Sequence, residues 1–282
     1  MIILDLNQVM ISNLMVQIGN HTNAAVEENM FRHMILNTIR SLNVKFRDEY
    51  GELVIAADAG NCWRKNAFPY YKANRKKGQE TSEINWSSIF ECMNKIRTEL
   101  KEFFPYRVIH IDGCEADDSI ACLVNTYHKV DNILIISGDK DFNQLHYNDV
   151  KQYDPVRKKF IVCANPEAYL EEHILRGDKG DGVPNVLSDG DTFVLGKRQK
   201  TLTQKKLDEL IKTSLHGKFD HPLYRNFNRN RILIDLANTP TELKKQIIDS
   251  YEEQYNKTGS KLMNYFMANR LKNLMECMGD FV

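Results

Sequence analysis

Acidic residues follow four apolar runs in the first half of the chain. The first run ends at Asp5 and the second at Asp58, the third is followed by the acids of residues 115–118, and the fourth by Asp139 and Asp141. Short runs rich in Ile, Val and Leu, separated by helical patterns, are typical of buried strands in a parallel sheet. Ligands of such sheets bind outside the carboxyl ends of the strands. We therefore expect these acids to converge on one rim.

A cluster of carboxylates favours metal chemistry. Like charges close together repel and raise one another's pKa, so the cluster is costly unless cations neutralise it. Oxygen ligands suit Mg²⁺, with Mn²⁺ as a substitute. Each acid taken alone has an ordinary explanation as a helix cap, a first-turn residue or a loop former, but their recurrence after every predicted parallel strand favours a metal site. The candidate ligands are Asp5, Asp58, Glu115, Asp117, Asp118, Asp139, Asp141, Asp178 and Asp181.

Cations alternate with aromatic residues between positions 63 and 77, which read WRKNAFPYYKANRKK. Stacking planes combined with phosphate-binding charges are what single-stranded nucleic acid requires. A solvated basic loop is the alternative, although such loops rarely carry so many rings. A second basic stretch begins at position 197, and its helical part could equally be a solvated surface helix. The candidate nucleic-acid contacts are Arg64, Lys65, Tyr70, Tyr71, Lys72, Arg75, Lys76, Lys77, Lys197, Arg198, Lys200 and Lys205.

The overall composition excludes little by itself. The 282 residues carry 38 basic and 38 acidic side chains, so the net charge is zero although the two signs are segregated along the chain. The six cysteines show neither CxxC spacing nor a paired framework, which favours reduced thiols of a cytoplasm. Met1 leads directly into the first apolar run, so we expect no secretory signal. No apolar run approaches the roughly 20 residues that span a bilayer, and we expect a cytoplasmic, membrane-free protein.

The elements that position these residues divide the chain into two parts. Residues 165–166 (Asn-Pro) and the sequence TPTE from Thr239 to Glu242, a capping box, predict helix starts. A helix is also predicted over residues 260–278, and residues 178–202 are the likeliest irregular segment. We therefore predict an α/β core over residues 1–163 and an α-helical region over residues 164–282. Strands are predicted at residues 2–6, 53–57, 107–111 and 132–136, with a two-stranded ribbon over 150–163.

Several of these segments together resemble the flap endonuclease or 5′-nuclease superfamily, and within it the ribonuclease H group of T-even bacteriophages. The motifs that carry the resemblance are CEADD (Cys114–Asp118), SGDKDF (Ser137–Phe142), YYKANR (Tyr70–Arg75), GDKGDGVPN (Gly177–Asn185) and RILIDL (Arg231–Leu236). The resemblance implies a PIN-like, doubly wound, mostly parallel sheet with a helical arch over about 61–84. It also implies an α-helical C-terminal half with a helix-turn-helix-type duplex-binding element after Asp181.

The resemblance implies roles for individual residues. Lys72 and Arg75 match the cationic pair at the base of the family's arch, and Tyr70 and Tyr71 would stack on bases. Catalytic roles are implied for Lys72, Arg75 and Asp139. The first metal would be bound by Asp5, Asp58, Glu115, Asp118 and Asp139, with Asp117 nearby. The second, more loosely held metal would be bound by Asp141, Asp178 and Asp181.

The chain departs from the family pattern in the GDxxDN motif and after it. Gly182 stands where the family has Asn, and the following residues lack the Gly-x-Gly-x-Lys turn that binds a monovalent cation in family members. The chain also begins four residues before Asp5, which predicts no N-terminal arm for a partner.

The function implied is that of a Mg²⁺-dependent 5′-to-3′ exonuclease and flap endonuclease that uses two metal ions. It would act as a monomer on RNA–DNA hybrids, 5′-flap DNA and nicked duplexes during lagging-strand replication, with a single-strand-binding protein and a sliding clamp as possible partners. A non-catalytic flap-binding replication protein is the alternative, but it would not need the acids. A haloacid-dehalogenase-type phosphatase would need an Asp where Asn7 stands, and a PIN-type ribonuclease usually lacks the arch and the helical half.

Overall fold

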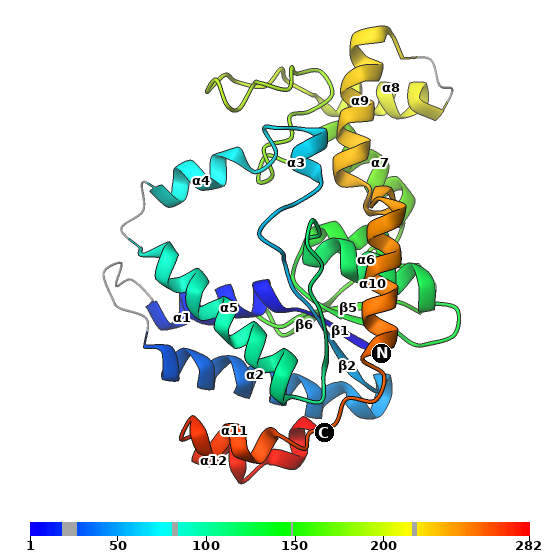
Figure 1. Ribbon diagram of the computed structural model, residues 1–282. Helices are drawn as coiled ribbons and strands as arrows, with labels where there is room; N and C mark the ends of the chain where they lie inside the picture. The colour runs from blue at the N-terminus through cyan, green and yellow to red at the C-terminus, as the bar shows by residue number, and fades with distance from the viewer. Residues whose placement is uncertain (19–26, 81–83, 148, 216–218) are drawn as a thin grey trace.

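A six-stranded sheet forms the centre of the molecule (Figure 1). The computed structural model describes residues 1–18, 27–80, 84–147, 149–215 and 219–282. The strands are ordered β3-β2-β1-β4-β5-β6, and only the β5–β6 pair is antiparallel. Their bounds are β1 Ile2–Asp5, β2 Leu53–Ala56, β3 Arg107–Ile109, β4 Leu134–Ile136, β5 Lys151–Asp154 and β6 Lys159–Ile161.

The register of the parallel strands brings their carboxyl ends to one edge. Asp5 pairs with Ala56, and Leu4 pairs with Ile136, so the residues that follow β1, β2 and β4 emerge side by side. The four strands predicted from the sequence are confirmed, each within a few residues. The predicted ribbon is also confirmed, and the structure adds that its first strand extends the parallel sheet.

Helices cover both faces of the sheet and create two apolar cores. Helices α2 and α5 contribute to the core on one face, while α6 and α10 contribute to the core on the other. The buried strand residues alternate between them, because successive side chains of a strand point to opposite faces. The helix bounds in this part are α1 Leu6–Ile18, α2 Glu28–Tyr50, α3 Arg64–Ala67, α4 Ala73–Glu80, α5 Trp86–Phe103 and α6 Ala116–Tyr127, followed by the 3₁₀ helix η1 Lys140–Leu145.

Helix α1 is not anticipated by the sequence analysis. It begins directly after β1 and buries Leu6, Val9, Met10 and Leu14, whereas Val16 is exposed. Apolar side chains thus occur on more than one face of this helix, so a single apolar stripe is absent from its sequence pattern.

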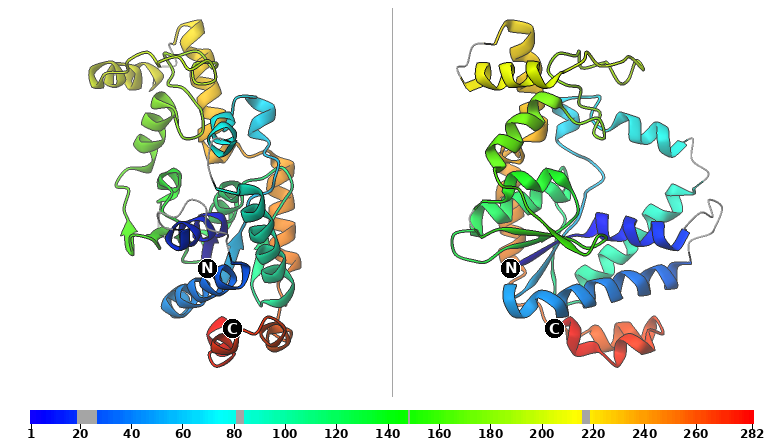
Figure 2. Two further views of the ribbon diagram at one scale, coloured as in Figure 1. Left: turned by 90° about the vertical axis from the view of Figure 1, so that its left-hand side faces the viewer. Right: turned by 180° about the vertical axis from the view of Figure 1, so that it is seen from behind.

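The C-terminal region is distributed over the molecule. Helices α7, α8 and α9 lie at the end beyond the carboxyl edge of the sheet, α10 runs along α6, and α11 and α12 lie at the opposite end (Figures 1 and 2). The boundary at residue 163 stays a prediction, since later residues join both cores. The bounds are α7 Pro166–Arg176, α8 Gln204–Leu215, α9 His221–Ile234, η2 Leu236–Asn238, α10 Thr241–Glu253, α11 Leu262–Ala268, α12 Lys272–Met275 and η3 Met278–Phe281.

The segment after Asp181 is irregular until α8 begins at Gln204. Helices α7 and α8 pack against each other, but residues 177–203 connect them without helix in between. Gly177 has a φ of 69°, and an added Cβ would lie 2.4 Å from the carbonyl oxygen of Val183. Only glycine permits this close approach, which folds the GDKGDGVPN loop back on itself. The segment after Asp181 is therefore a long loop that leads into α8, and its role in binding a duplex stays a prediction.

Candidate active site

The carboxylates after β1, β2 and β4 are held in place by hydrogen bonds to their own surroundings. Asp5 accepts a hydrogen bond from the hydroxyl of Ser137 at 3.0 Å and one from the amide of Gln8 at 3.1 Å. Asp58 accepts one from the amide of Ala116 at 2.7 Å, at the start of α6. Asp139 caps η1. The sheet edge and the first turns of two helices thus fix the carboxylate positions.

Burial and mutual repulsion disfavour ionisation in this group. Burial raises the pKa of Asp5 to about 7, and the charge of Asp58 adds to the effect. Burial likewise raises the pKa of Asp58. The pKa of Asp117 lies well above its usual value because the side chain is buried near the charges of Asp139 and Glu115. We refer to Asp5, Asp58, Asp117 and Asp139 as the first acid group. Carboxylates whose charges repel in this way fit a divalent cation as the missing counter-charge.

A second group lies between η1 and α7. Atoms of Asp141, His173 and Asp178 all lie within 4.8 Å of one another. Burial raises the pKa of Asp141 to about 7, and the charge of Asp139 adds to the effect. Burial alone would also raise the pKa of Asp178, but hydrogen bonds from His173 and Lys140 outweigh it and lower that pKa. Lys140 Nζ lies 2.7 Å from Asp178 Oδ2.

The base of the arch is tied to the same rim. Lys72 Nζ donates to Glu115 Oε1 at 2.5 Å, and Arg75 donates to Asp181 Oδ1 at 2.6 Å. The hydroxyl of Tyr71 donates to both Glu115 and Asp181. Burial opposes ionisation of Glu115, but the charges of Lys72 and Arg64 outweigh it and lower the pKa of that carboxyl.

Lys72 has a left-handed backbone, with a φ of 56°, and its amide donates to the carbonyl of Asp181 at 2.8 Å. Such conformations are costly for a residue with a side chain, and they persist where surrounding contacts enforce them. Gly182 has a φ of 73°, and an added Cβ would lie 3.1 Å from the carbonyl of Tyr70. The family's Asn also tolerates this region of φ, so the Gly182 departure preserves the backbone that the loop needs.

Two residues predicted to contact ligands are buried beneath the rim. Arg64 is 1% exposed and Asp118 is fully buried, and the two terminal guanidinium nitrogens donate to the Asp118 carboxylate at 2.9 and 3.0 Å. Asp118 also accepts hydrogen bonds from Trp63 and from the amide of Glu115. The prediction that Arg64 contacts nucleic acid is wrong, because its side chain does not reach the surface. Asp118 has donors on both oxygens, so its geometry is that of a structural acid.

Thr239 contributes to the same buried network instead of capping a helix. Its hydroxyl donates to Asp118 at 2.7 Å, and α10 begins one residue after Pro240 without a side-chain cap. The predicted capping box at Thr239 is therefore wrong, although the helix start is correct. The buried carboxylate of Asp118 needs a donor more than the helix end does, because an unpaired buried charge is far costlier than an exposed amide.

The other predicted nucleic-acid contacts divide by exposure. Tyr70 is 40% exposed, whereas Tyr71 is 4% exposed and uses its hydroxyl for the two acids, which contradicts a stacking role for Tyr71. The side chains of Lys76 and Lys77 lie outside the described part of the structure. The remaining candidates are exposed, and they are Lys65, Lys197, Arg198, Lys200 and Lys205.

Several positioning residues escape prediction from the sequence. Gln152 is fully buried and donates to the carbonyls of Ser137 and Asp139, while Gln144 donates to the carbonyl of Asp141. Both amides clamp the loop that carries the acids of SGDKDF. Gln152 lies in β5, whose sequence KQYD is polar, so its burial is not signalled by the sequence. Nothing in the sequence distinguishes His173 from an ordinary helix residue either.

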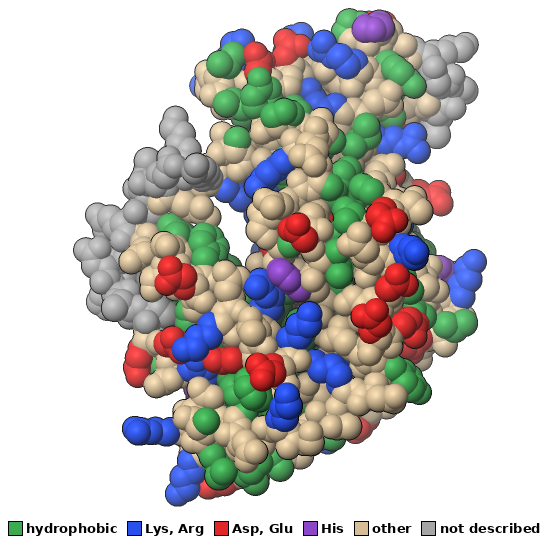
Figure 3. Space-filling model, viewed as in Figure 1, with side chains coloured by type: hydrophobic (Ala, Val, Ile, Leu, Met, Phe, Trp, Pro, Cys, Tyr) green, Lys and Arg blue, Asp and Glu red, His purple; other side chains and the backbone are tan. Residues whose placement is uncertain are grey.

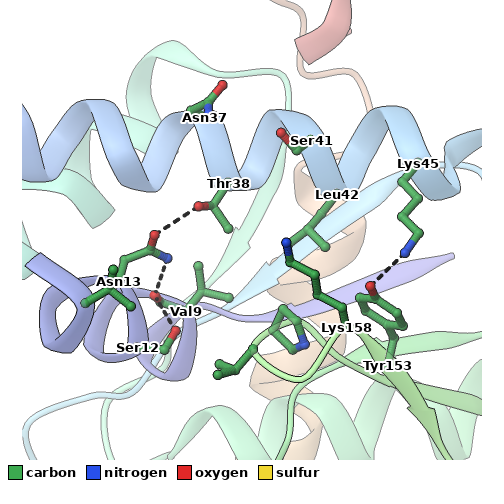
Figure 4. Close-up of a pocket in the computed structure, with 13 residues that line it drawn as sticks. Val9, Ser12, Asn13, Asn37, Thr38, Ser41, Leu42, Lys45, Tyr153 and Lys158 are labelled. Carbon is green, nitrogen blue, oxygen red and sulfur yellow. Dashed lines mark hydrogen bonds between the residues drawn. The ribbon is translucent and has the colours of Figure 1, made fainter.

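A cleft of about 750 Å³ adjoins the rim beneath the arch. It is lined by acids and cations together, including Asp58, Glu115, Lys72, Arg75 and Arg97. A different cavity, of about 530 Å³, lies between α1, α2 and the β5–β6 turn, and Figure 4 shows its polar wall of amides and hydroxyls. No acid is among the residues that line that second cavity, so its chemistry does not suit a divalent metal. On the face in Figure 3, acidic and basic side chains are interspersed, in keeping with the zero net charge.

Two family models together match almost the whole chain. Residues 6–174 match the model described as 5′-3′ exonuclease, N-terminal resolvase-like domain, and residues 164–281 match T4 RNase H, C terminal. The chain belongs to the 5′-3′ exonuclease family. The resemblance inferred from the CEADD, SGDKDF and GDKGDGVPN motifs is thereby confirmed.

Individual relatives agree with this assignment. The chain is 32% identical to the ribonuclease H of Enterobacteria phage T4, over 99% of this chain and 95% of that protein. It is 28% identical to the flap endonuclease Xni of Shewanella sp. (strain MR-4), over 45% of this chain and 49% of that protein.

The fold is shared with a solved structure, the bacteriophage T5 flap endonuclease in a pseudo-enzyme-product complex with DNA and metal ions. The TM-score is 0.66 at 18% identity, covering 90% of this chain and 98% of that one. The PIN-like architecture predicted from the sequence is thus confirmed. None of the helices within the described ranges is long and apolar enough to cross a membrane.

Proposed function

We propose that this protein is a Mg²⁺-dependent 5′ nuclease that removes RNA primers and 5′ flaps during lagging-strand replication. The observation that carries the proposal is the first acid group beside a cleft of about 750 Å³, in which burial raises the pKa values of Asp5, Asp58 and Asp117. Its substrates would be RNA–DNA hybrids, 5′-flap DNA and nicked duplexes. Mn²⁺ is expected to substitute for Mg²⁺.

The metal ligands we propose follow the geometry of the rim. Asp5, Asp58, Asp117 and Asp139 would hold the first ion, with Glu115 beside them. Asp141, Asp178 and Asp181 belong to the second site, while Asp118 acts indirectly, by anchoring Arg64 and the start of α6. When bound, the ions would activate a water and neutralise charge on the leaving oxygen.

The cations at the base of the arch would act on the substrate. Lys72 and Arg75 lie at the cleft and are held by Glu115 and Asp181, so their charges are fixed before a phosphate arrives. Preorganised charge of this kind stabilises the negative charge that develops at a phosphate in the transition state. Tyr70 is exposed next to this pair and is suited to stack on a base near the 5′ end.

Contacts to the rest of the duplex would come from exposed cations. Lys65 lies on the arch side, and Lys197, Arg198, Lys200 and Lys205 lie on and before α8. Contacts to phosphates carry little sequence information, which suits an enzyme that accepts both RNA and DNA strands. A monomer in the host cytoplasm, meeting a single-strand-binding protein and a sliding clamp, completes the proposal.

The test is cleavage of a 5′-labelled RNA–DNA hybrid and a 5′-flap DNA in Mg²⁺. The parent protein should release short 5′ products, and Asp139→Asn should lose this activity. Asp112→Asn is the matched control, because Asp112 is an exposed acid outside both acid groups. If the parent binds the flap and cuts neither substrate, a non-catalytic flap-binding protein is the better description.

A further inference from the structure

His173 occupies an unusual position in the second acid group. The side chain is 7% exposed and comes from the last turn of α7. Its Nε2 lies 3.2 Å from Asp178 Oδ2, and its Nδ1 lies 3.8 Å from Asp141 Oδ1. Among the described residues, neither His173 Nδ1 nor Asp141 Oδ1 has a hydrogen-bond partner. Two buried polar atoms thus face each other across a gap that is too long for a hydrogen bond.

The neighbours of His173 determine which ring nitrogen carries the proton. Asp178 Oδ2 is within hydrogen-bond distance of His173 Nε2 and also contacts Lys140, while Asp178 Oδ1 accepts from the amide of Asp181. An ionised carboxylate is an acceptor only, so Nε2 must be the donor to it. The lone pair of the neutral ring is then on Nδ1, which lies 3.8 Å from Asp141 Oδ1, an acceptor in the ionised carboxylate.

A cation between His173 Nδ1 and Asp141 Oδ1 would give both acceptor atoms a partner. Metal-bound histidines commonly donate their other ring nitrogen to a carboxylate, which fixes the tautomer and the ring orientation. Asp178 has that role in this arrangement. The distance of 3.8 Å between Nδ1 and Oδ1 matches two ligands that lie about 2.1 Å from one ion at a wide angle.

We propose that His173 Nδ1 and Asp141 Oδ1 are direct ligands of the second metal ion, and that Asp178 orients the imidazole instead of binding the ion. The inference rests on the proposed metal-dependent nuclease, and it specifies the metal at its second site. A nitrogen ligand favours transition ions such as Mn²⁺, Co²⁺ or Zn²⁺ over Mg²⁺, which prefers oxygen ligands. The second site is therefore selective for transition metals, whereas the first site, built from carboxylates, is not.

Pulsed electron paramagnetic resonance of bound Mn²⁺ tests the ligand directly, because it detects ¹⁴N nuclei bonded to the ion. The purified full-length protein would be loaded with two equivalents of Mn²⁺, and the bound ions counted by equilibrium dialysis. We expect a ¹⁴N coupling in the parent protein and its loss in His173→Gln. His221→Gln is the matched control, since His221 is exposed at the start of α9. It should retain the coupling.

Dialysis in competition with Mg²⁺ provides the second measurement. At the second site, the ratio of Mn²⁺ affinity to Mg²⁺ affinity should be at least tenfold higher in the parent protein than in His173→Gln. Asp141→Asn, which keeps the size of the side chain, should lose that site and keep the other. A parent protein without a ¹⁴N coupling, or a coupling that survives in folded His173→Gln, would overturn the inference.

The failures of the two proposals are distinguishable. If the parent protein cleaves the flap substrate but shows no ¹⁴N coupling, the proposal that His173 is a metal ligand is refuted and the proposed nuclease function is retained. If the parent protein shows a ¹⁴N coupling that is lost in His173→Gln but cuts neither substrate, the proposed nuclease function is refuted. The metal site with mixed nitrogen and oxygen ligands is then retained. Far-ultraviolet circular dichroism of each variant establishes that the fold is intact in every comparison.

Discussion

Two sets of carboxylates on the same rim differ in how the protein compensates their charge. Asp5, Asp58 and Asp117 have no ion-pair partner within 4 Å among the residues that the structure describes, and burial raises their pKa values. Asp178 and Asp181, in contrast, are paired with Lys140 and with Arg75. The first set is prepared for an external cation, whereas the second is already neutralised by side chains. The same residue type therefore serves opposite electrostatic purposes.

This difference has a consequence for metal affinity. An ion that binds the first acid group relieves repulsion, so it should bind tightly and stabilise the fold. Lys140 already compensates the charge of Asp178 beside the second site, so an ion there relieves less repulsion and its binding should be weaker. The predicted looser second metal follows from these local cations.

The largest expected effect comes from removing one charge from each set. Asp5→Asn should reduce cleavage about 100-fold or more, because metal stabilisation of the transition state is worth several kcal/mol. The same change should raise the melting temperature of the metal-free protein at pH 8, since it removes a buried, repelled charge. Asp178→Asn should lower that melting temperature, because it leaves Lys140 without its partner. Cleavage assays and thermal unfolding in EDTA measure both.

Changes of the same sign in the two metal-free melting temperatures would refute the comparison. Asp112→Asn, at an exposed acid outside both sets, should leave cleavage and melting unchanged.

Arg64 and Lys65 are neighbouring cations whose contributions to stability should differ, because Arg64 is buried in an ion pair and Lys65 is exposed. Arg64→Ala should lower the free energy of unfolding by about 3–5 kcal/mol, because the change leaves the charge of Asp118 buried without a partner. Lys65→Ala, at the exposed neighbouring position, should change it by less than about 0.5 kcal/mol. Urea unfolding monitored by fluorescence measures both values. Equal effects would show that Asp118 does not depend on Arg64.

The pH dependence of stability sharpens the electrostatic contrast. The pKa of folded Asp5 is about 7, above the ordinary value of 3.8, and that of Asp141 is also about 7. The folded state therefore binds more protons than the unfolded state between pH 4 and 7, and the contribution of these groups to stability falls as pH rises through that window. The melting temperature of the metal-free protein should fall by several degrees between pH 4 and pH 7. With Mg²⁺ or Mn²⁺ present, this fall should be smaller.

A decrease of the same size with and without millimolar metal would contradict a metal site at the first acid group. The opposite trend below pH 4, where Glu115 and Asp178 lose charges that are stabilised by cations, serves as an internal reference.

The smallest expected effect belongs to the exposed cations before α8. Lys200→Ala should weaken duplex binding by less than tenfold and reduce the salt dependence of the affinity by about one counterion. Lys129→Ala is the control, because Lys129 is exposed just beyond α6, at the end of that helix away from the rim. Binding titrations at several salt concentrations measure the slope. If the salt dependence of the affinity is unchanged in Lys200→Ala, this residue does not contact the phosphates of the duplex.

The strands and the rim were predictable because their signals are local. Each apolar run with a terminal acid specifies a buried strand and the residue at its carboxyl end, and the parallel sheet then brings Asp5, Asp58 and Asp139 together. The helix that follows β1 was not predictable, because its apolar residues do not keep to one face. Gly182 could be recognised as a departure from the motif, but the reason for it lies in the contact with Tyr70.

The sequence by itself determined the α/β core, the acidic rim and the basic arch, since periodicity and residue type are properties of the chain. Only the tertiary structure decided what each acid does. Asp118 became structural because Arg64, 54 positions earlier, donates to both of its oxygens. His173 entered the second acid group because α7 packs against η1. The pKa of a carboxylate depends on burial and on charges that folding brings near, and the residues adjacent in sequence determine neither of these.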